Sequence, residues 1–439
     1  MKPLVFVLLF SYSLISGLDA QVIKKFDFGT GAVESRYTQV TALDTYSDAK
    51  GYGFDYGTNA MAVNRGGKSP LNSDYCTGIG SVFFSTKLPQ GSYKVTVTLG
   101  DALRATSATI KAEARRLMVK EIDTKVGEFK EVSFNVSVWD SAIAAGKYVN
   151  LKPREKDKLD WDNKLTLEFS NSNPCINAIK IEPIDNPVQV FLMGNSTVTD
   201  QALEPWCCWG QMIPAFFTGD KVVVTNMAAS GETLRSSFNR KRLDKVASML
   251  HKGDYVFIEF AHNDQKKGSG EEAYTTYNKF LKIFADSVRN HGAIPVFVTS
   301  TNRRNFDKNG KVINTLGDFP DAMRLEAKKE GITLIDLNKM TKTLYEAYGE
   351  EASKRLFVQY PIGSFPGQSD LLEDNTHFST FGAYELAKCM VTGIQNSDLD
   401  LKRYLKSDLK PFNINHPDDF KTWSLPVTPM FSDIKPYGN

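Results

Sequence analysis

The spacing of apolar residues changes along this chain, and that change limits the folds that it can adopt. From Gln21 to about Asp185, apolar residues occupy every second position of several runs, as in Tyr93, Val95 and Val97. Successive side chains of a strand point to opposite faces, so this spacing predicts strands with one buried face. Glycine, asparagine and proline separate the runs, as expected of turns between antiparallel strands. The first part of the chain is therefore predicted to be a β-sandwich.

After Pro183 the pattern changes to short, continuous apolar runs that alternate with helical patterns. The runs are Val188–Met193, Val222–Thr225, Tyr255–Phe260, Ile294–Thr299 and Thr333–Leu337. Apolar residues from Tyr274 to Val288 recur at helical spacing, and Ser269 with Glu272 predicts a capping box where that helix begins. Buried strands separated by amphipathic helices predict an α/β domain with a parallel, doubly wound sheet.

These patterns divide the chain into four segments. Residues 1–20 contain Lys2, an apolar stretch and small residues before Gln21, which is typical of a signal peptide. Residues 21–185 form the predicted sandwich, residues 186–400 the α/β domain, and residues 401–439 an irregular strap expected to pack on the α/β domain. The apolar stretch is shorter than the roughly twenty residues of a membrane span. We therefore expect a secreted or periplasmic protein with no membrane span after cleavage.

Charge and cysteine content argue against some classes of function. Lysine and arginine number 53 against 51 aspartate and glutamate, and the net charge of +2 gives no support to nucleic-acid binding. The five cysteines are too few for a disulfide scaffold and form no zinc motif. In an oxidising compartment Cys76 and Cys175 could pair, which the sequence leaves open. The neighbours Cys207 and Cys208 are expected to be free thiols. We expect no metal or other cofactor, and a monomer.

Polar motifs follow three of the predicted parallel strands. They are Gly194–Val198 after the first strand, Asn226–Gly231 after the second and Ala261–Asp264 after the third. A fourth motif, Asp374–His377, stands just before a predicted helix. Ligands of an open parallel sheet bind at the carboxyl ends of the strands. The motifs are therefore predicted to contribute to one site.

In this order, the motifs resemble the conserved blocks of the SGNH, or GDSL-type, esterase family. Ser196 matches the first block, Gly231 the second, Asn263 the third, and Asp374 with His377 the fifth. The surrounding residues are most similar to those of the rhamnogalacturonan acetylesterase branch. The resemblance covers about residues 188–396 and implies a flavodoxin-like, three-layer α/β sandwich. The sequence Phe-Asp-Phe-Gly at residues 26–29 also resembles a galactose-binding-like domain of that branch.

The matched residues suit hydrolysis of an ester by a serine nucleophile. Ser196 would attack the carbonyl carbon, His377 would take and later return its proton, and Asp374 would fix the imidazole tautomer. The backbone N–H groups of Ser196 and Gly231 and the side-chain amide of Asn263 would stabilise the oxyanion. Each residue also has an ordinary structural explanation, such as a helix cap or a turn glycine. Their coincidence in this order favours the catalytic interpretation.

Further residues near these motifs are candidates for substrate binding. Trp206 and Trp209 could stack on a sugar ring or belong to the core. His262 could shape the pocket wall or pack beneath its loop. Arg235 could attract an acidic sugar, although a solvated surface charge is the default explanation. Asn195 stands where the family usually has Asp, and we expect its side chain to hold the turn as an acceptor.

The leading hypothesis is an esterase that removes O-acetyl groups from a pectic polysaccharide, rhamnogalacturonan. A second hypothesis keeps the same triad but changes the substrate to acetylated xylan or to an acyl lipid or thioester. A third is a non-catalytic carbohydrate-binding protein with a relic site. Because all the proposed chemistry lies after Gly194, residues 21–185 are expected to be dispensable for hydrolysis of a small ester, provided that the rest of the chain folds. Whether they bind sugar stays open.

Overall fold

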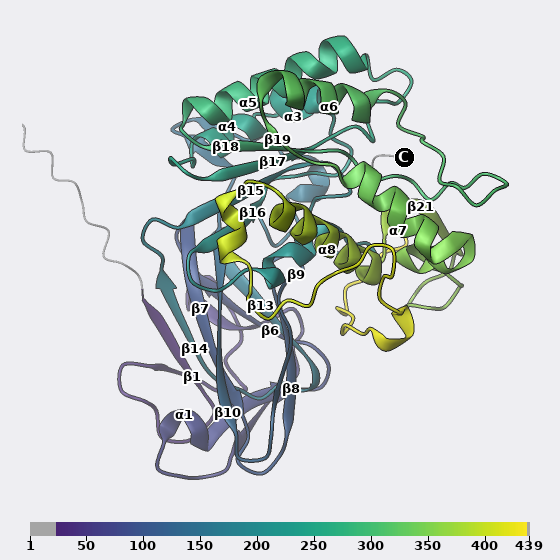
Figure 1. Cartoon of the computed structure of the whole chain (residues 1–439). Coiled ribbons are helices and arrows are strands. Elements are labelled where there is room, and N and C mark those ends of the chain that lie inside the picture. The colour runs from purple at the N-terminus through teal and green to yellow at the C-terminus, as the bar shows by residue number, and fades with distance from the viewer. Residues whose placement is uncertain (1–22, 437–439) are drawn as a thin grey trace, which may run out of the picture.

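The computed structural model describes residues 23–436, so the predicted signal peptide at residues 1–20 lies outside the described part of the chain. The chain folds as an all-β sandwich followed by an α/β domain, and the sandwich lies below the parallel sheet in Figure 1. This architecture confirms the predicted fold class. No helix within residues 23–436 combines the length and the apolar character that crossing a membrane requires.

Two sheets form the sandwich. The first has the order β10-β7-β14-β1-β2, with β5 paired to β14 and β4 to β5: β10 (Phe129–Val138), β7 (Gly91–Gly100), β14 (Ile176–Pro183), β1 (Lys24–Phe28), β2 (Thr38–Val40), β5 (Asp74–Gly78) and β4 (Ala60–Asn64). The second has the order β3 (Tyr52–Asp55), β6 (Val82–Lys87), β13 (Lys164–Asn173), β8 (Thr106–Ala112) and β9 (Arg116–Thr124). Alternating residues such as Val95, Val97, Leu165 and Leu167 fill the space between the sheets. Burial of one face per sheet is what the two-residue spacing predicts.

Five parallel strands form the sheet of the α/β domain. Their order is β16 (Val222–Asn226), β15 (Val188–Gly194), β17 (Tyr255–Glu259), β18 (Ile294–Val298) and β19 (Thr333–Ile335). Each strand begins at the residue where the corresponding apolar run begins. Val190 of β15 pairs with both Val224 and Tyr255, which places β15 inside the sheet. The residues that follow β15 therefore emerge at the carboxyl edge between two neighbouring strands.

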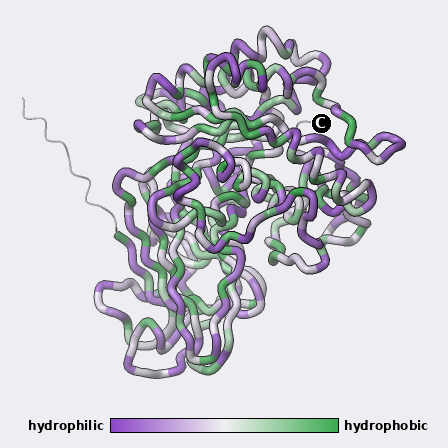
Figure 2. The backbone as a smooth tube through the Cα atoms, in the orientation of Figure 1, coloured by the Kyte–Doolittle hydropathy of each residue, from purple (hydrophilic) through white to green (hydrophobic). Residues whose placement is uncertain are grey.

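Helices cover both faces of this sheet, so the domain has three layers with the sheet in the middle (Figure 1). One face packs against α3 (Leu234–Asn239), α4 (Arg242–Ala247), α5 (Asn278–Asn290) and α6 (Phe319–Glu330). The other face packs against α2 (Trp209–Met212), α7 (Leu337–Ala352) and α8 (Thr380–Asn396). Phe191 and Met193 of β15 pack with the first of these two groups of helices, whereas Val190 and Leu192 pack with the second. Figure 2 shows hydrophobic stretches along the strands of both domains.

The helix predicted from Tyr274 onward is present, but it starts differently from the prediction. A π-helical turn, Ala273–Tyr277, precedes α5. The predicted capping box of Ser269 and Glu272 does not form, so that prediction is wrong. Ser269 Oγ donates to the Asp264 carbonyl and accepts from the backbone N–H of Glu271, so it stabilises the loop before the helix.

The C-terminal strap, residues 401–436, is mostly irregular, with short 3-10 turns at Asp400–Tyr404 and Phe420–Thr422. Phe412 and Trp423 pack against the core of the α/β domain. The strap also contacts the sandwich, because Lys111 Nζ of β8 donates to the carbonyl of Pro426 at 2.8 Å. The strap thus bridges the two domains, whereas the sequence associated it with the α/β domain alone.

All five cysteines are buried and free. Cys76 and Cys175 therefore form no disulfide, and Cys207 and Cys208 are free thiols as expected. Within residues 23–436, no group of three or more His, Cys, Asp or Glu side chains is arranged to hold a metal ion.

Candidate active site

Ser196 lies in the turn that follows β15, at the carboxyl edge of the parallel sheet. The carbonyl of Asn195 accepts a hydrogen bond from the N–H of Val198 at 3.2 Å. The Asn195 side-chain oxygen accepts from the N–H of Thr197 at 3.1 Å and from its hydroxyl at 2.9 Å. These local bonds hold the turn, which is the role that the sequence predicts for Asn195.

The three residues predicted to form a triad lie within hydrogen-bonding distance of one another. His377 Nε2 is 2.9 Å from Ser196 Oγ, and His377 Nδ1 is 2.7 Å from Asp374 Oδ2. Asp374 and His377 lie on β21 (Leu372–Phe378), which pairs antiparallel with β20 (Phe357–Tyr360) just before α8. All three side chains are buried. The arrangement can pass a proton from the hydroxyl to the imidazole.

Asp374 is held as a carboxylate. Its Oδ1 accepts from the backbone N–H groups of Thr376 at 2.7 Å and His377 at 3.0 Å. Burial alone would raise the pKa of Asp374, but the hydrogen bonds from His377 and Thr376 outweigh it and hold that pKa well below its usual range. The ammonium group of Lys435 lies 3.2 Å from Asp374 Oδ2. Asp374 therefore keeps its charge and orients the imidazole of His377.

Three groups near Ser196 could stabilise an oxyanion. Within residues 23–436, the backbone N–H groups of Ser196 and Gly231 donate to no other protein group. Gly231 has a φ of 78°, a left-handed conformation that favours glycine. Asn263 uses one side-chain N–H to donate to the Glu232 carbonyl at 3.0 Å, which leaves its second N–H for a ligand. The geometry thus permits the predicted oxyanion hole, whose assignment to these three donors stays a prediction.

The sandwich contributes cations directly beside that predicted oxyanion hole. Lys152 Nζ donates to the Ser230 carbonyl at 2.7 Å, and the guanidinium of Arg154 donates to the same oxygen. Lys152 also pairs with Glu232 at 2.6 Å. The Ser230 carbonyl and the Gly231 N–H belong to one peptide group, so these cations restrain the orientation of that N–H. Sequence reasoning missed them because no spacing pattern connects residues 152–154 with residue 230.

A second set of contacts holds the loop after Ser196 against the sandwich. Arg116, the first residue of β9, places Nε 2.6 Å from Asp200 Oδ2. Arg115 places a guanidinium nitrogen 2.5 Å from Glu204 Oε2 and donates to the Trp206 carbonyl at 2.8 Å. All four charged side chains are buried. The expectation that residues 21–185 are dispensable for hydrolysis of a small ester stays a prediction, and these contacts argue against it, because removal of the sandwich would take the cations from Asp200 and Glu204.

The two candidate tryptophans have different positions. Trp209 is fully buried, and its Nε1 donates to Glu259 Oε2 at 2.6 Å. This burial favours the alternative that Trp209 belongs to the core, against its role as a substrate-binding residue. Trp206 lies edge-on to the imidazole of His377 with ring centroids 5.7 Å apart. It is 3% exposed and lines a cavity beside the triad.

The remaining candidates, His262 and Arg235, are both engaged by the protein. His262 is 1% exposed, its Nε2 lies 3.2 Å from Thr301 Oγ1, and burial lowers its pKa well below the usual value. This burial favours the alternative that His262 packs beneath its loop. Arg235, on α3, pairs with Glu271 at 2.7 Å, and its contact with substrate stays a prediction.

Replacing Asn195 by Asp is expected to change kcat by no more than about tenfold, which corresponds to about 1.4 kcal/mol. Asp keeps the oxygen that accepts from Thr197, so the turn should persist. Nitrophenyl acetate hydrolysis measures the effect, with Asn195→Ala as the variant that removes the acceptor. A wild-type protein without activity that Asn195→Asp switches on would contradict this prediction and favour a relic site.

Glu259, at the end of β17, lies behind the nucleophile turn. One of its carboxyl oxygens lies 2.8 Å from Thr197 Oγ1, and the other accepts from Trp209 Nε1 at 2.6 Å. Burial raises the pKa of Glu259 to about 7, although these hydrogen bonds oppose the shift. The carboxyl group of Glu259 therefore binds a proton more tightly in the folded protein than in the unfolded chain. This tighter binding stabilises the fold fully at a pH below the pKa of Glu259 in the unfolded chain. The stabilisation is lost as the pH rises toward 7.

Accordingly, Glu259→Gln should flatten the pH dependence of stability. In the wild type, Glu259 should lower the free energy of unfolding by up to about 3 kcal/mol between roughly pH 4.5 and 7. Urea denaturation at several pH values measures this slope for both proteins. Burial also raises the pKa of Asp264 to about 7, so part of the slope should persist in the variant. Equal slopes in the two proteins would contradict the prediction.

Two family models match separate parts of the chain. A model described as Beta-agarase/YXIM esterase-like, galactose-binding domain-like matches residues 24–132. A model described as GDSL-like Lipase/Acylhydrolase matches residues 190–390. The second range contains every residue of the predicted triad and oxyanion hole.

Curated proteins and solved structures extend these matches. The rhamnogalacturonan acetylesterase RhgT of Bacillus subtilis (strain 168) is 47% identical over 223 residues, which are 50% of this chain and 95% of that protein. The uncharacterized esterase YxiM of the same organism is 27% identical over 346 residues, 76% of this chain and 84% of that protein. A crystal structure of the Bacillus subtilis YxiM protein covers 85% of this chain and 98% of its own at 24% identity and a TM-score of 0.45. The YxiM sequence match is longer than the α/β domain and strap together, so it extends into the sandwich.

Proposed function

Because the chain belongs to the GDSL-like lipase/acylhydrolase family and is an esterase, we propose that it removes O-acetyl groups from rhamnogalacturonan, a pectic polysaccharide. The observation that carries this proposal is the hydrogen-bonded series of Ser196, His377 and Asp374 at the carboxyl edge of the parallel sheet. The 47% identity to RhgT, which is named a rhamnogalacturonan acetylesterase, supports carbohydrate acetylesterase activity and this choice of substrate. We further propose that the protein acts outside the cytoplasm, where such a polymer is accessible.

In the proposed mechanism, Ser196 Oγ attacks the acetyl carbonyl carbon while His377 Nε2 takes the hydroxyl proton. Asp374 keeps the other imidazole N–H in place and stabilises the imidazolium. His377 then gives its proton to the sugar oxygen as the C–O bond breaks, which leaves an acetyl group on Ser196. In the second half, His377 takes a proton from water, the resulting hydroxide attacks the acetyl group, and the proton returns to Ser196 Oγ. Acetate leaves.

The oxyanion of each tetrahedral intermediate lies near donors that are already in position. We assign them as the backbone N–H groups of Ser196 and Gly231 and the free side-chain N–H of Asn263. Lys152 and Arg154 hold the carbonyl of the Ser230–Gly231 peptide group, so its N–H needs little reorientation as charge develops. Restrained donors stabilise the transition state better than mobile ones because they do not have to reorganise.

The test is acetate release from acetylated rhamnogalacturonan, acetylxylan and a series of nitrophenyl esters of rising acyl length. We expect kcat/KM to be at least about tenfold higher for acetylated rhamnogalacturonan than for acetylxylan, a difference of about 1.4 kcal/mol in transition-state binding. Ser196→Ala serves as the blank for each substrate. A preference for long acyl chains, or equal rates on both polysaccharides, would contradict the proposed substrate.

A further inference from the structure

The strap reaches the proposed triad in its last described residues. The backbone N–H of Glu204 donates to the Met430 carbonyl at 2.8 Å, and the N–H of Ser432 donates to the Glu204 carbonyl at 3.0 Å. Trp206 Nε1 donates to the Ser432 carbonyl at 2.9 Å. Because the ring of Trp206 also lies edge-on to the imidazole of His377, these bonds give the strap a defined place beside the triad.

Lys435 extends from this part of the strap to the carboxylate of the triad. Its Nζ lies 3.2 Å from Asp374 Oδ2, the same oxygen that lies 2.7 Å from His377 Nδ1. The other oxygen, Oδ1, accepts from the backbone N–H groups of Thr376 and His377. A carboxylate offers about four lone-pair sites, so these contacts use its full capacity. Lys435 therefore takes the remaining position on the carboxylate that orients the imidazole.

The ammonium group of Lys435 is close enough to the imidazole to act on its charge. Both groups contact Asp374 Oδ2, so they are less than about 6 Å apart, a range at which two positive charges repel each other appreciably. The side chain of His377 is 1% exposed and that of Lys435 is 45% exposed. Water and salt therefore screen this repulsion only in part.

Other titratable and charged groups face the same imidazole from neighbouring elements. They are His262 and Lys266 in the loop after β17, Glu259 at the end of β17 behind the nucleophile turn, and Arg303 in the loop after β18. Burial, together with the positive charges of Arg303 and Lys435, lowers the pKa of Lys266. All of these groups stay in the protein when Lys435 is replaced, so a change in the pH profile reports on Lys435.

The direction of the effect follows from the role of His377 as the base. His377 must be neutral to take the proton of Ser196, so activity rises with pH as the imidazolium loses its proton. A cation on Asp374 disfavours the imidazolium, so the proton leaves at a lower pH. Without Lys435, the carboxylate of Asp374 would hold the imidazolium more strongly, and a higher pH would be needed to form the base.

We propose that Lys435 is a positioning residue of the triad: held against Asp374 by the strap, its positive charge extends the activity of the esterase to lower pH. The inference rests on the triad of the proposed function, but not on the identity of the sugar that carries the acetyl group. It assigns the strap a part in the chemistry, through a side chain that does not touch the substrate.

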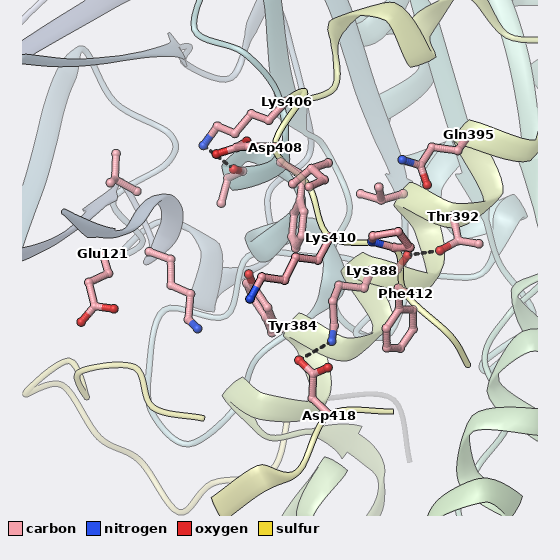
Figure 3. Close-up of a pocket in the computed structure, with 17 residues that line it drawn as sticks. Glu121, Tyr384, Lys388, Thr392, Gln395, Lys406, Asp408, Lys410, Phe412 and Asp418 are labelled. Carbon is pink, nitrogen blue, oxygen red and sulfur yellow. Dashed lines mark hydrogen bonds and ion pairs between the residues drawn. The ribbon is translucent and has the colours of Figure 1, made fainter. Parts of the chain in front are cut away.

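Lys410 provides a matched control from the same strap. It lines a cavity of about 450 Å³ between β9, α8 and the strap, which Figure 3 shows and to whose lining no triad residue contributes. In that cavity Lys388 pairs with Asp418 of the strap at 2.7 Å, as the dashed line marks. Replacing Lys410 removes one positive charge from the strap and leaves the contact between Lys435 and Asp374 in place.

The test compares pH profiles of kcat/KM for nitrophenyl acetate in the wild type, Lys435→Met, Lys435→Arg and Lys410→Met. In Lys435→Met we expect the pH of half-maximal kcat/KM to rise by at least about half a pH unit, which lowers the rate about threefold at pH values well below that midpoint. Lys435→Arg and Lys410→Met should keep the wild-type midpoint. Added salt should narrow the difference between Lys435→Met and the wild type, because Lys435 is partly exposed.

NMR titration of the His377 imidazole makes the same comparison without turnover, with His377→Ala identifying its signal. Its midpoint should rise in Lys435→Met by the same half unit or more, to about the extent that kcat/KM shows. A loss of packing alone would change the melting temperature but would not move this midpoint.

Equal midpoints in the wild type and Lys435→Met, or an equal shift in Lys410→Met, would overturn the proposal. These outcomes are separate from failure of the proposed function. If the wild type released no acetate from the polysaccharide but Lys435→Met still shifted both midpoints, the substrate would be wrong and the role of Lys435 would stand. If the polysaccharide were deacetylated and neither midpoint moved, the reverse would hold.

Discussion

Replacing Ser196 or His377 by alanine is expected to lower kcat by at least about a thousandfold, because the nucleophile and its base act as one unit. The 2.9 Å contact between Ser196 Oγ and His377 Nε2 is the physical basis of that expectation. The double variant should be little worse than either single variant, since each change alone already stops proton transfer. Hydrolysis of nitrophenyl acetate measures all three proteins, and a phosphonate should label Ser196 only in the wild type.

Asp374→Asn provides a sharper test of the same unit. The carboxylate accepts from His377 Nδ1 at 2.7 Å, and an amide nitrogen placed there would favour the wrong imidazole tautomer. The variant should keep its melting temperature within a few degrees but lose most of its kcat. His291→Ala is the matched control, because His291 is exposed and lies at the end of α5. If Ser196→Ala or His377→Ala kept more than about a tenth of wild-type turnover, the triad assignment would be wrong.

The second large effect is expected at the interface between the two domains. Arg116→Met should lower the free energy of unfolding by about 3–5 kcal/mol, because it leaves the buried carboxylate of Asp200 without its cation. Arg116 is fully buried, contacts Asp200 at 2.6 Å, and lies over the ring of Trp139 at 4.7 Å. Urea denaturation measures the loss. Adding Asp200→Asn should recover part of it, because the unpaired charge is then removed.

Lys130→Met is the control for this experiment. Lys130 pairs with Glu128 at 3.6 Å, and both side chains are well exposed. Exposed pairs contribute about 0–1 kcal/mol, so this variant should unfold almost like the wild type. A chain that begins at residue 186 should lose activity toward nitrophenyl acetate together with its folded structure. An Arg116→Met protein as stable as Lys130→Met, or a shortened chain with wild-type activity, would show that the interface does not support the site.

Local patterns were sufficient for much of the architecture. A strand that is buried on both faces needs a continuous apolar run, and one that is buried on a single face needs alternation, so both periods can be recognised within a few residues. The five parallel strands accordingly begin where their apolar runs begin. Asp374 and His377 are three positions apart, and the motif around Ser196 follows the first of these strands. These residues could be predicted as a catalytic triad because each motif lies within a short stretch of sequence.

Local sequence patterns therefore predicted the five parallel strands, the change from sandwich to parallel sheet, and the residues of the candidate triad. Three features could be seen only in the folded molecule: Trp209 lies in the core, Arg115 and Arg116 neutralise carboxylates of the other domain, and Lys435 pairs with Asp374. The two kinds of feature differ because a sequence pattern reports only on neighbouring residues. Periodicity reports which face of an element is buried, whereas a contact between residues far apart in the chain depends on how whole domains pack. A buried charge also has no sequence signature of its own, since its stability comes entirely from the partner that packing supplies.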